Sequence, residues 1–102
     1  MSAATLFRAL GDEQRWTLLQ RLGPAPKRLG ELAEGLDITR QAVRKHLDVL
    51  AEANLVTLRP VGRTTMVEPN ARAIAQARQE LDLLSQRWDE RLVRLKRHLE
   101  GG

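Results

Sequence analysis

Residues 38–50 read ITRQAVRKHLDVL, and this stretch decides the fold. Thr39 is a favourable N-cap residue, so a helix is expected to begin directly after it. Ile38 and Val43 occupy the N′ and N4 positions, where two apolar side chains pack together and fix the start of a helix. We therefore predict a helix that ends near Asn54. Its apolar face carries Val43, Leu47 and Leu50, and its opposite face carries Arg40, Gln41, Arg44, Lys45 and Asp48.

A shorter helix is expected over residues 29–34, where the apolar residues share one helix face. Gly35 ends it, and about four residues connect it to the next helix. The two together predict a helix-turn-helix over residues 29–54. Residues 23–26, GPAP, form a linker because their two prolines prevent a regular helix. Further upstream we predict helices over residues 3–10 and 13–22, the second with Asp12 as N-cap and with Trp16, Leu18, Leu19 and Leu22 turned inward.

Residues 55–69 have the pattern of a β-hairpin. Two β-prone segments, LVTL at 55–58 and TTMV at 64–67, flank the turn-forming RPVGR at 59–63. Pro60 is expected to limit pairing at the end of the first strand, because proline has no N–H to donate. A basic hairpin directly after a helix-turn-helix is typical of a wing.

The outward side of the helix after Thr39 carries residue types that read DNA. Gln pairs with adenine edges, Arg with guanine edges, and Lys or Arg with phosphates. We predict that Gln41 contacts adenine and Arg44 guanine, whereas Lys45 contacts phosphate. The alternative for Arg44 is a phosphate contact that only positions the helix, in which case Arg40 and Gln41 read the bases. On the wing, Arg59 and Arg63 could reach phosphates or a minor groove. The predicted DNA-binding residues are Thr39, Arg40, Gln41, Arg44, Lys45, Arg59 and Arg63.

Residues 71–99 are predicted to form one long helix with a narrow apolar stripe. The stripe begins at Ile74 and Ala77 and recurs every three or four residues to Leu99. So long a stripe resembles a helix-packing seam, and so small a domain has little core to cover it, which predicts a homodimer. The predicted interface residues are Leu6, Phe7 and Leu10 of the first helix with Leu81, Leu84, Trp88, Leu92 and Leu95 of the last.

Composition excludes several classes of protein. A length of 102 residues suits a single domain over residues 1–102. The net charge of +4 mildly favours a partner that carries phosphate. There is no cysteine, and the two histidines lie far apart, so we expect no metal site, no cofactor and no enzymatic activity. His46 is interpreted as a packed structural residue. No apolar run approaches a membrane span, so the expected location is the cytoplasm, in association with the nucleoid.

Several segments together resemble the ArsR/SmtB-type winged helix-turn-helix repressors. Residues 10–19, LGDEQRWTLL, are similar to the opening motif of that family, and residues 31–33, ELA, to its next motif. Residues 39–50, TRQAVRKHLDVL, are similar to its recognition segment, while ANLV at 53–56 and GR at 62–63 are similar to the segments around its wing. The predicted fold is therefore mainly α with a small β-hairpin wing.

The resemblance implies a homodimeric repressor of its own or a neighbouring operon. Each subunit would place one recognition helix in successive major grooves of a pseudo-palindromic operator. Arg44 departs from the serine usual in the family, and the Cys-x-Cys and Asp/His ligand motifs of its metal sensors are missing, which implies a member that senses no metal. An unidentified small molecule or protein could act as effector. The alternative is a winged-helix interaction module without specific DNA binding.

Overall fold

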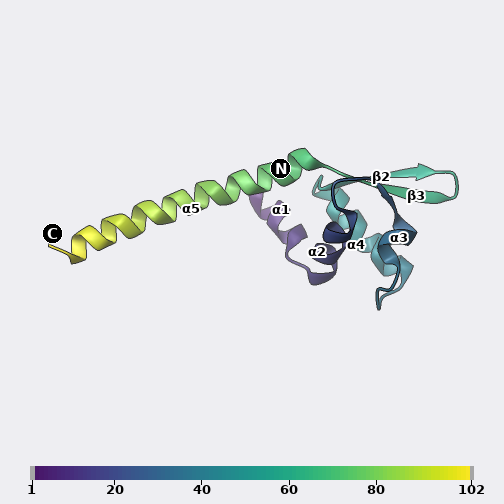
Figure 1. Cartoon of the computed structure of the whole chain (residues 1–102), viewed down its shortest axis with the longest axis horizontal. Helices are drawn as coiled ribbons and strands as arrows, with labels where there is room; N and C mark the ends of the chain where they lie inside the picture. Colours follow the sequence, from purple (N-terminus) through teal and green to yellow (C-terminus); the bar gives the residue numbers. More distant parts are fainter. Residues whose placement is uncertain (1, 102) are drawn as a thin grey trace.

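The computed structural model describes residues 2–101 as a small body from which a long helix extends (Figure 1). The particle measures 68 × 26 × 20 Å, and the hairpin and the outer part of the last helix extend from opposite ends of the body. In chain order the elements are α1 (Ala3–Leu10), α2 (Glu13–Leu22), β1 (Lys27–Arg28), α3 (Leu29–Ala33), α4 (Arg40–Glu52), β2 (Val56–Val61), β3 (Thr64–Pro69) and α5 (Ala71–Leu99).

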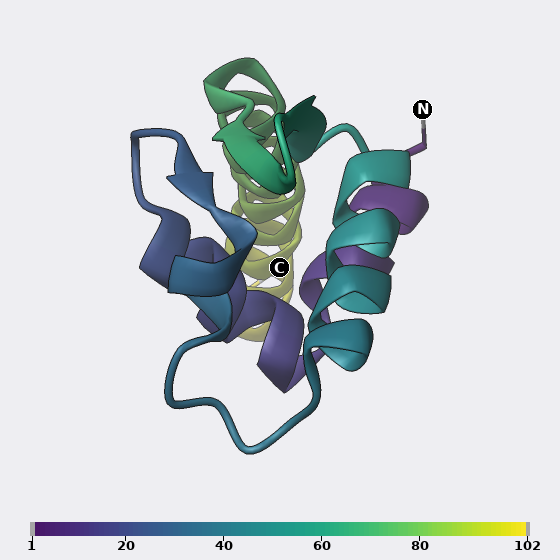
Figure 2. The ribbon, with the colours of Figure 1, turned by 90° about the vertical axis from the view of Figure 1, so that its right-hand side faces the viewer.

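The helix-turn-helix is formed by α3 and α4, as the sequence predicts. Thr39 is the N-cap of α4, and its Oγ1 accepts a hydrogen bond from the Ala42 N–H at 3.0 Å. At the other end the chain leaves the helix through Asn54, which has a left-handed φ of 59°. α3 ends at Ala33, one residue before the predicted end. The connection between the two helices loops out below both of them (Figure 2).

The sheet has one strand more than the sequence predicts. Its order is β1-β3-β2, with β1 pairing antiparallel to β3 so that Lys27 lies opposite Val67. The expectation that Pro60 limits pairing is wrong, because β2 continues through it to Val61 and Pro60 pairs in register with Thr65. β2 is an edge strand, where a residue without an N–H is tolerated.

The hairpin turns tightly at Gly62 and Arg63. Gly62 has a φ of 61°, whereas Arg63 is not in the left-handed region. Positive φ at only the first of two central residues is the pattern of a type II′ turn, which favours glycine there. Thr64 Oγ1 also donates to the Val61 carbonyl at 2.9 Å. The turn therefore holds Arg63 at the outermost point of the hairpin.

The core corrects one prediction about α2. Leu18 and Leu22 are buried as expected, and Leu19 is half-buried, but Trp16 is 52% exposed. The inward placement of Trp16 is therefore wrong, because the core is closed by leucines and valines from six elements without it. That core consists of Leu6, Ala9, Leu18, Leu22, Leu32, Val43, Leu47, Leu50, Ala53, Leu55, Val56, Val67, Ala73 and Ala77.

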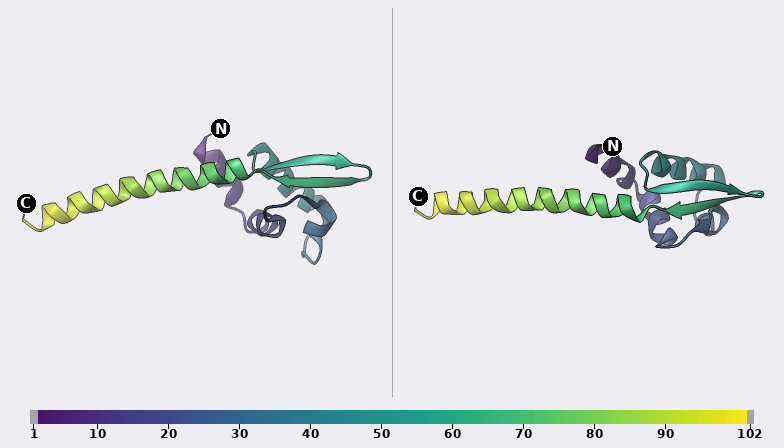
Figure 3. Two further views of the ribbon diagram at one scale, coloured as in Figure 1. Left: turned by 45° about the horizontal axis from the view of Figure 1, so that its top comes forward. Right: turned by 90° about the horizontal axis from the view of Figure 1, so that it is seen from above.

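The long final helix is confirmed over residues 71–99. Asn70 caps it and also donates from Nδ2 to the Asn54 carbonyl at 2.8 Å, which ties the start of α5 to the end of α4. Ala73 and Ala77 are buried against the body. From residue 81 to residue 101 every side chain is exposed, so the outer part of α5 extends as an isolated arm (Figure 3).

Candidate nucleic-acid interface

The first two turns of α4 present a polar surface. Gln41, Arg44 and Lys45 are exposed on the side opposite Val43 and Leu47, which face the core. The free N–H groups at the start of the helix and the cationic side chains together favour an anion such as phosphate. The N-terminal end of α4 therefore has the chemistry of a DNA-reading helix.

A groove of about 660 Å³ separates α3, the start of α4 and the tip of the hairpin. Arg28, Arg40 and Arg63 line it from three different elements. Glu31 of α3 and Glu34, the residue that follows α3, also line the groove. The structure thus brings together Arg40 and Arg63, two of the sequence-predicted residues, although they are far apart in sequence.

Arg40 lies close to the backbone of α3. A Cβ added to Gly30 would meet the Arg40 Nη2 atom at 3.2 Å, so the guanidinium rests almost on the glycine. A larger residue at position 30 would push the end of this flexible side chain outward. Glycine at this position therefore lets the first residue of α4 fold back against α3.

Arg44 connects α4 to the hairpin. Its Nε donates to Asp48 Oδ1 at 3.1 Å, and its Nη1 donates to Thr65 Oγ1 of β3 at 3.2 Å. The guanidinium is thus held by a carboxylate on its own helix and by a hydroxyl on β3, so it bridges the two elements. Thr65 was not identified from the sequence, because nothing local to it indicates contact with a helix 21 residues earlier.

The two arginines of the hairpin differ in their partners. Arg59 forms a salt bridge with Glu68 on the neighbouring strand, with Nη2 and Oε1 2.8 Å apart. Within residues 2–101, Arg63, Arg40 and Lys45 form no salt bridge. The charge of Arg59 is thus partly compensated, whereas the arginine at the tip is available for an anionic partner.

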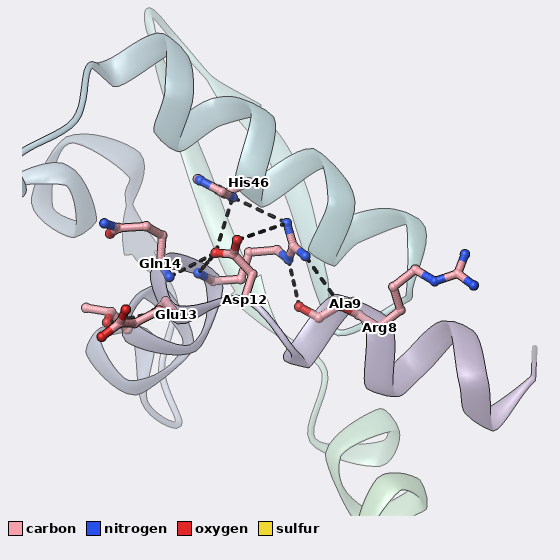
Figure 4. Close-up of polar contacts among 8 residues, drawn as sticks. Arg8, Ala9, Asp12, Glu13, Gln14 and His46 are labelled. Atoms are coloured by element: carbon pink, nitrogen blue, oxygen red, sulfur yellow. Dashed lines mark hydrogen bonds and ion pairs between the residues drawn. The ribbon is translucent and has the colours of Figure 1, made fainter.

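A polar cluster fixes the back of α4 to the α1–α2 junction (Figure 4). Asp12 caps α2, and its Oδ1 accepts from the N–H groups of Gln14 at 2.9 Å and Arg15 at 3.1 Å. His46 Nδ1 lies 3.8 Å from the same oxygen and 3.4 Å from Arg15 Nη1. Arg15 also donates from Nε to the Ala9 carbonyl at 2.7 Å. His46 therefore has a structural position, away from the exposed face of α4.

The pKa of Asp12 is lowered from its ordinary value. The hydrogen bond from the Arg15 N–H has the largest effect. Partial burial opposes it, whereas the positive charge of Arg15 and the nearby His46 ring act in the same direction as the hydrogen bond. The folded state thus favours the carboxylate form, which is also the form that caps α2.

The predicted interface residues on α1 and α5 fall into two groups. Leu6 is buried in the core of its own chain, and Phe7 and Leu10 are half-buried beside it. The residues on the arm are strongly exposed, at 44% for Leu84 and 61% for Trp88. Leu6 therefore packs in the core of its own chain, whereas the apolar stripe on the arm packs against no other part of residues 2–101.

Two further observations concern other kinds of site. Among residues 2–101, no group of three or more His, Asp or Glu side chains is arranged to hold a metal ion. In the same part of the chain, no helix has both the length and the apolar character needed to cross a membrane.

Comparison with known proteins identifies the family. Residues 4–59 match the family model described as "Helix-turn-helix domain". The HTH-type transcriptional regulator Rv2034 of Mycobacterium tuberculosis is 38% identical over 76 residues, which are 74% of this chain and 71% of that protein. The uncharacterized HTH-type transcriptional regulator YuzN of Bacillus subtilis is 42% identical over 65 residues, covering 57% of this chain and 71% of that protein.

The similarity extends to the whole fold, including the long helix. The solved structure of an ArsR-like transcriptional regulator from Rhodococcus sp. RHA1 superposes with a TM-score of 0.81 at 34% identity. The match covers 98% of this chain and 94% of that one. With the helix-turn-helix, the wing and the polar face of α4 described above, these similarities show that the chain belongs to the ArsR-type family of winged helix-turn-helix transcriptional regulators, which bind DNA.

Proposed function

We propose that this protein acts as a homodimeric repressor that reads a pseudo-palindromic operator with α4 and holds the adjacent backbone with the wing. The observation that carries the proposal is the groove between α3, α4 and the hairpin, which Arg40 and Arg63 line, together with the exposed polar side chains on the first turns of α4. In a helix-turn-helix the first turns of the second helix enter the major groove.

Within this surface we assign separate roles to the side chains. Gln41 is exposed in the first turn and has the amide needed for bidentate pairing with adenine. Lys45 and Arg63 contact phosphates of the DNA backbone on the two sides of the major groove that α4 enters. Arg44 positions the wing through Thr65, so its part in base readout is smaller than its residue type alone predicts.

Anisotropy titrations with fluorescent duplexes test this assignment. Lys45→Ala is expected to lower affinity about equally for every sequence and to make the dependence on salt shallower, as loss of one phosphate contact does. Arg8→Ala is the matched control, because it removes one exposed cation from α1, at the end of the body away from the hairpin. An equal loss of affinity in the two variants would contradict a DNA interface localised on α4. It would leave only a general attraction between the positive chain and DNA.

The repressor role has its own test. A reporter gene placed behind the promoter of the protein's own operon should be expressed more strongly when the chain is deleted. Restoring the wild type should silence the reporter, and restoring Lys45→Ala should not. Lower expression on deletion would contradict repression and indicate an activator.

The alternative function, an interaction module that does not read DNA, is not favoured by α4. Its exposed first two turns contain no apolar side chain, whereas a protein-docking helix usually presents an apolar patch. The exposed apolar residues of the chain are concentrated on α5 instead.

A further inference from the structure

Gly30 is a glycine that the backbone of α3 does not require. It lies inside the helix Leu29–Ala33, where glycine lowers helix stability relative to alanine. Its φ is not in the left-handed region, in contrast to the φ of Gly23, Gly35 and Gly62. Neither helix propensity nor backbone conformation therefore accounts for glycine at this position, which leaves the space that its missing side chain gives to a neighbouring group.

That neighbouring group is the guanidinium of Arg40. Apart from Leu29, Glu31 and the backbone of α3, the only described atoms within 4 Å of a Cβ on Gly30 belong to it, with Nη2 at 3.2 Å and Cζ at 3.8 Å. A contact of 3.2 Å is closer than ordinary van der Waals contact with a Cβ. Alanine at position 30 would therefore push the guanidinium outward, and leucine would take its place. We call the surface over Gly30 the Arg40 seat.

The seat turns Arg40 toward the groove between α3, α4 and the hairpin. Among the described residues of α4, only Arg40 lines this groove, whereas Gln41 is exposed outside it. Two carboxylates of the groove, those of Glu31 and Glu34, form no salt bridge with Arg40 within residues 2–101. An anion that binds the seated guanidinium does not have to displace a bonded partner.

Two more arginines line the same groove. Arg63 reaches it from the tip of the hairpin, and Arg28 from β1, where it lies opposite Met66 of β3. Arg28 was not among the predicted DNA-binding residues, because the two-residue strand that places it has no pattern of its own. It is exposed and, within residues 2–101, forms no salt bridge. Three arginines from three elements therefore meet at one groove.

The position of the groove indicates which anion they bind. In a helix-turn-helix the first helix crosses the DNA backbone while the second enters the major groove. The first helix is α3 in this chain, so the groove beside it faces the backbone. Arginine binds phosphate through several N–H donors of one planar group, which suits three guanidinium groups around one phosphate.

We propose that Gly30 is a positioning residue for DNA binding. By seating the Arg40 guanidinium on α3 it directs Arg40, together with Arg28 and Arg63, to a phosphate of the DNA backbone instead of a base edge. This inference rests on the proposed reading of DNA by α4. It adds a phosphate site beside the reading helix, one further residue in it, and the residue that keeps the site open.

Gly30→Ala and Gly30→Leu fill the seat by degrees. Both new residues are better helix formers than glycine, so the melting temperature should stay the same or rise. Affinity for specific and random duplexes should nevertheless fall in the order wild type, alanine, leucine, by roughly threefold to tenfold for leucine, as for one lost hydrogen-bonded contact. The salt dependence should become shallower by about one unit of slope. A helix of unchanged or higher stability combined with weaker binding is a result that a purely structural role does not give.

The same substitution in an Arg40→Ala background separates the seat from the glycine itself. With no guanidinium to displace, Gly30→Leu should cause no further loss of affinity. An equal loss in that background would overturn the proposal, because it would show that leucine obstructs DNA directly. Unchanged or stronger binding by Gly30→Leu in the otherwise wild-type chain would overturn it too, because Arg40 would then leave the seat when DNA binds.

Single methylphosphonate substitutions, which are neutral, locate the phosphate on the duplex selected by the wild type. At one backbone position at least, the loss of affinity seen with the wild type should disappear in Arg40→Ala and Gly30→Leu and shrink in Arg28→Ala. Arg72→Ala is the matched control, since it removes an exposed cation at the start of α5 and should keep full sensitivity at that position. The same sensitivity in Arg40→Ala as in the wild type would overturn the proposal.

Lys45→Ala, measured beside these variants, shows where a failure lies. If Lys45→Ala weakens binding to every duplex but Gly30→Leu does not, the seat is wrong and the DNA interface on α4 stands. If neither variant weakens binding, the proposed interface itself is wrong.

Discussion

Arg44 of α4 and Thr65 of β3 are joined by a hydrogen bond of 3.2 Å, which connects the second helix of the helix-turn-helix directly to the wing. The same guanidinium is held from its own helix by Asp48. A side chain predicted from its residue type to read guanine therefore bridges α4 and the hairpin. Arg44 is exposed and Thr65 is half-buried, so a phosphate could reach the guanidinium without disturbing the core.

Arg44→Ala is predicted to weaken binding to every duplex and to leave the preferred sequence unchanged. Thr65→Val should have a smaller effect in the same direction, since it removes the wing's half of the contact and keeps the cation. Selection of bound duplexes for each variant, with titrations at one salt concentration, gives both results. A changed preference at a guanine position in Arg44→Ala would show that Arg44 reads bases.

Arg63→Ala is predicted to weaken binding by about 1–2 kcal/mol, with a shallower dependence on salt, if the tip of the wing contacts phosphate as we propose. The loss should be the same for specific and random duplexes. Arg59→Ala is the matched control, since Arg59 is on the same hairpin but already pairs with Glu68, and its effect should be smaller. Weakening of the specific complex alone would indicate that Arg63 reads a base or the width of a groove.

Asp12→Ala is predicted to lower the free energy of unfolding by about 1 kcal/mol, the usual cost of losing an N-cap. Asp12→Asn keeps the cap and should cost less. Because folding lowers the pKa of Asp12, its contribution is fully present above the unfolded-state pKa of about 3.9 and is lost as the pH falls through the folded-state value. Urea titrations should therefore show the wild type and Asp12→Asn converging below about pH 4. A gap that stays constant down to low pH would contradict the lowered pKa.

Leu84→Asp is predicted to shift the protein from dimer to monomer, because it buries a carboxylate without a partner at a cost of several kcal/mol. Sedimentation at micromolar concentration should give about twice 11.5 kDa for the wild type and less for the variant. Gln86→Asp adds the same charge on the opposite face of the arm and should leave the dimer intact. Equal dissociation in the two variants would mean that charge, not the stripe, controls assembly.

Local sequence determines the helices of this fold well. Asp12, Thr39 and Asn70 are N-caps whose side chains accept hydrogen bonds from the next turn, and the first two were predicted as caps from the sequence. The strand Lys27–Arg28 could not be predicted in this way, because its partner Val67 is 40 residues later and two residues have no periodicity of their own. A strand this short exists only because β3 is placed beside it.

The sequence predicts which residues belong to the candidate nucleic-acid interface, but not which side chains contact one another within it. Exposure of Gln41, Lys45 and Arg63 follows from the polar face of α4 and from the glycine turn, which are local. The pairing of Arg59 with Glu68 and of Arg44 with Thr65 depends on the register of the hairpin and its distance from α4. Trp16 shows the same limit, since its spacing fits the inner face of α2 but the core is filled without it.

Selection of bound sequences from random duplexes, carried out in parallel with the wild type and Gln41→Ala, tests sequence readout by α4 most directly. The wild type is predicted to enrich two symmetric half-sites. Gln41→Ala should lose preference at one adenine in each half-site and keep the rest, a discrimination of about 1–3 kcal/mol per contact. Enrichment of no sequence by the wild type, or the same sequences by both proteins, would contradict the assignment of α4 as the reading helix.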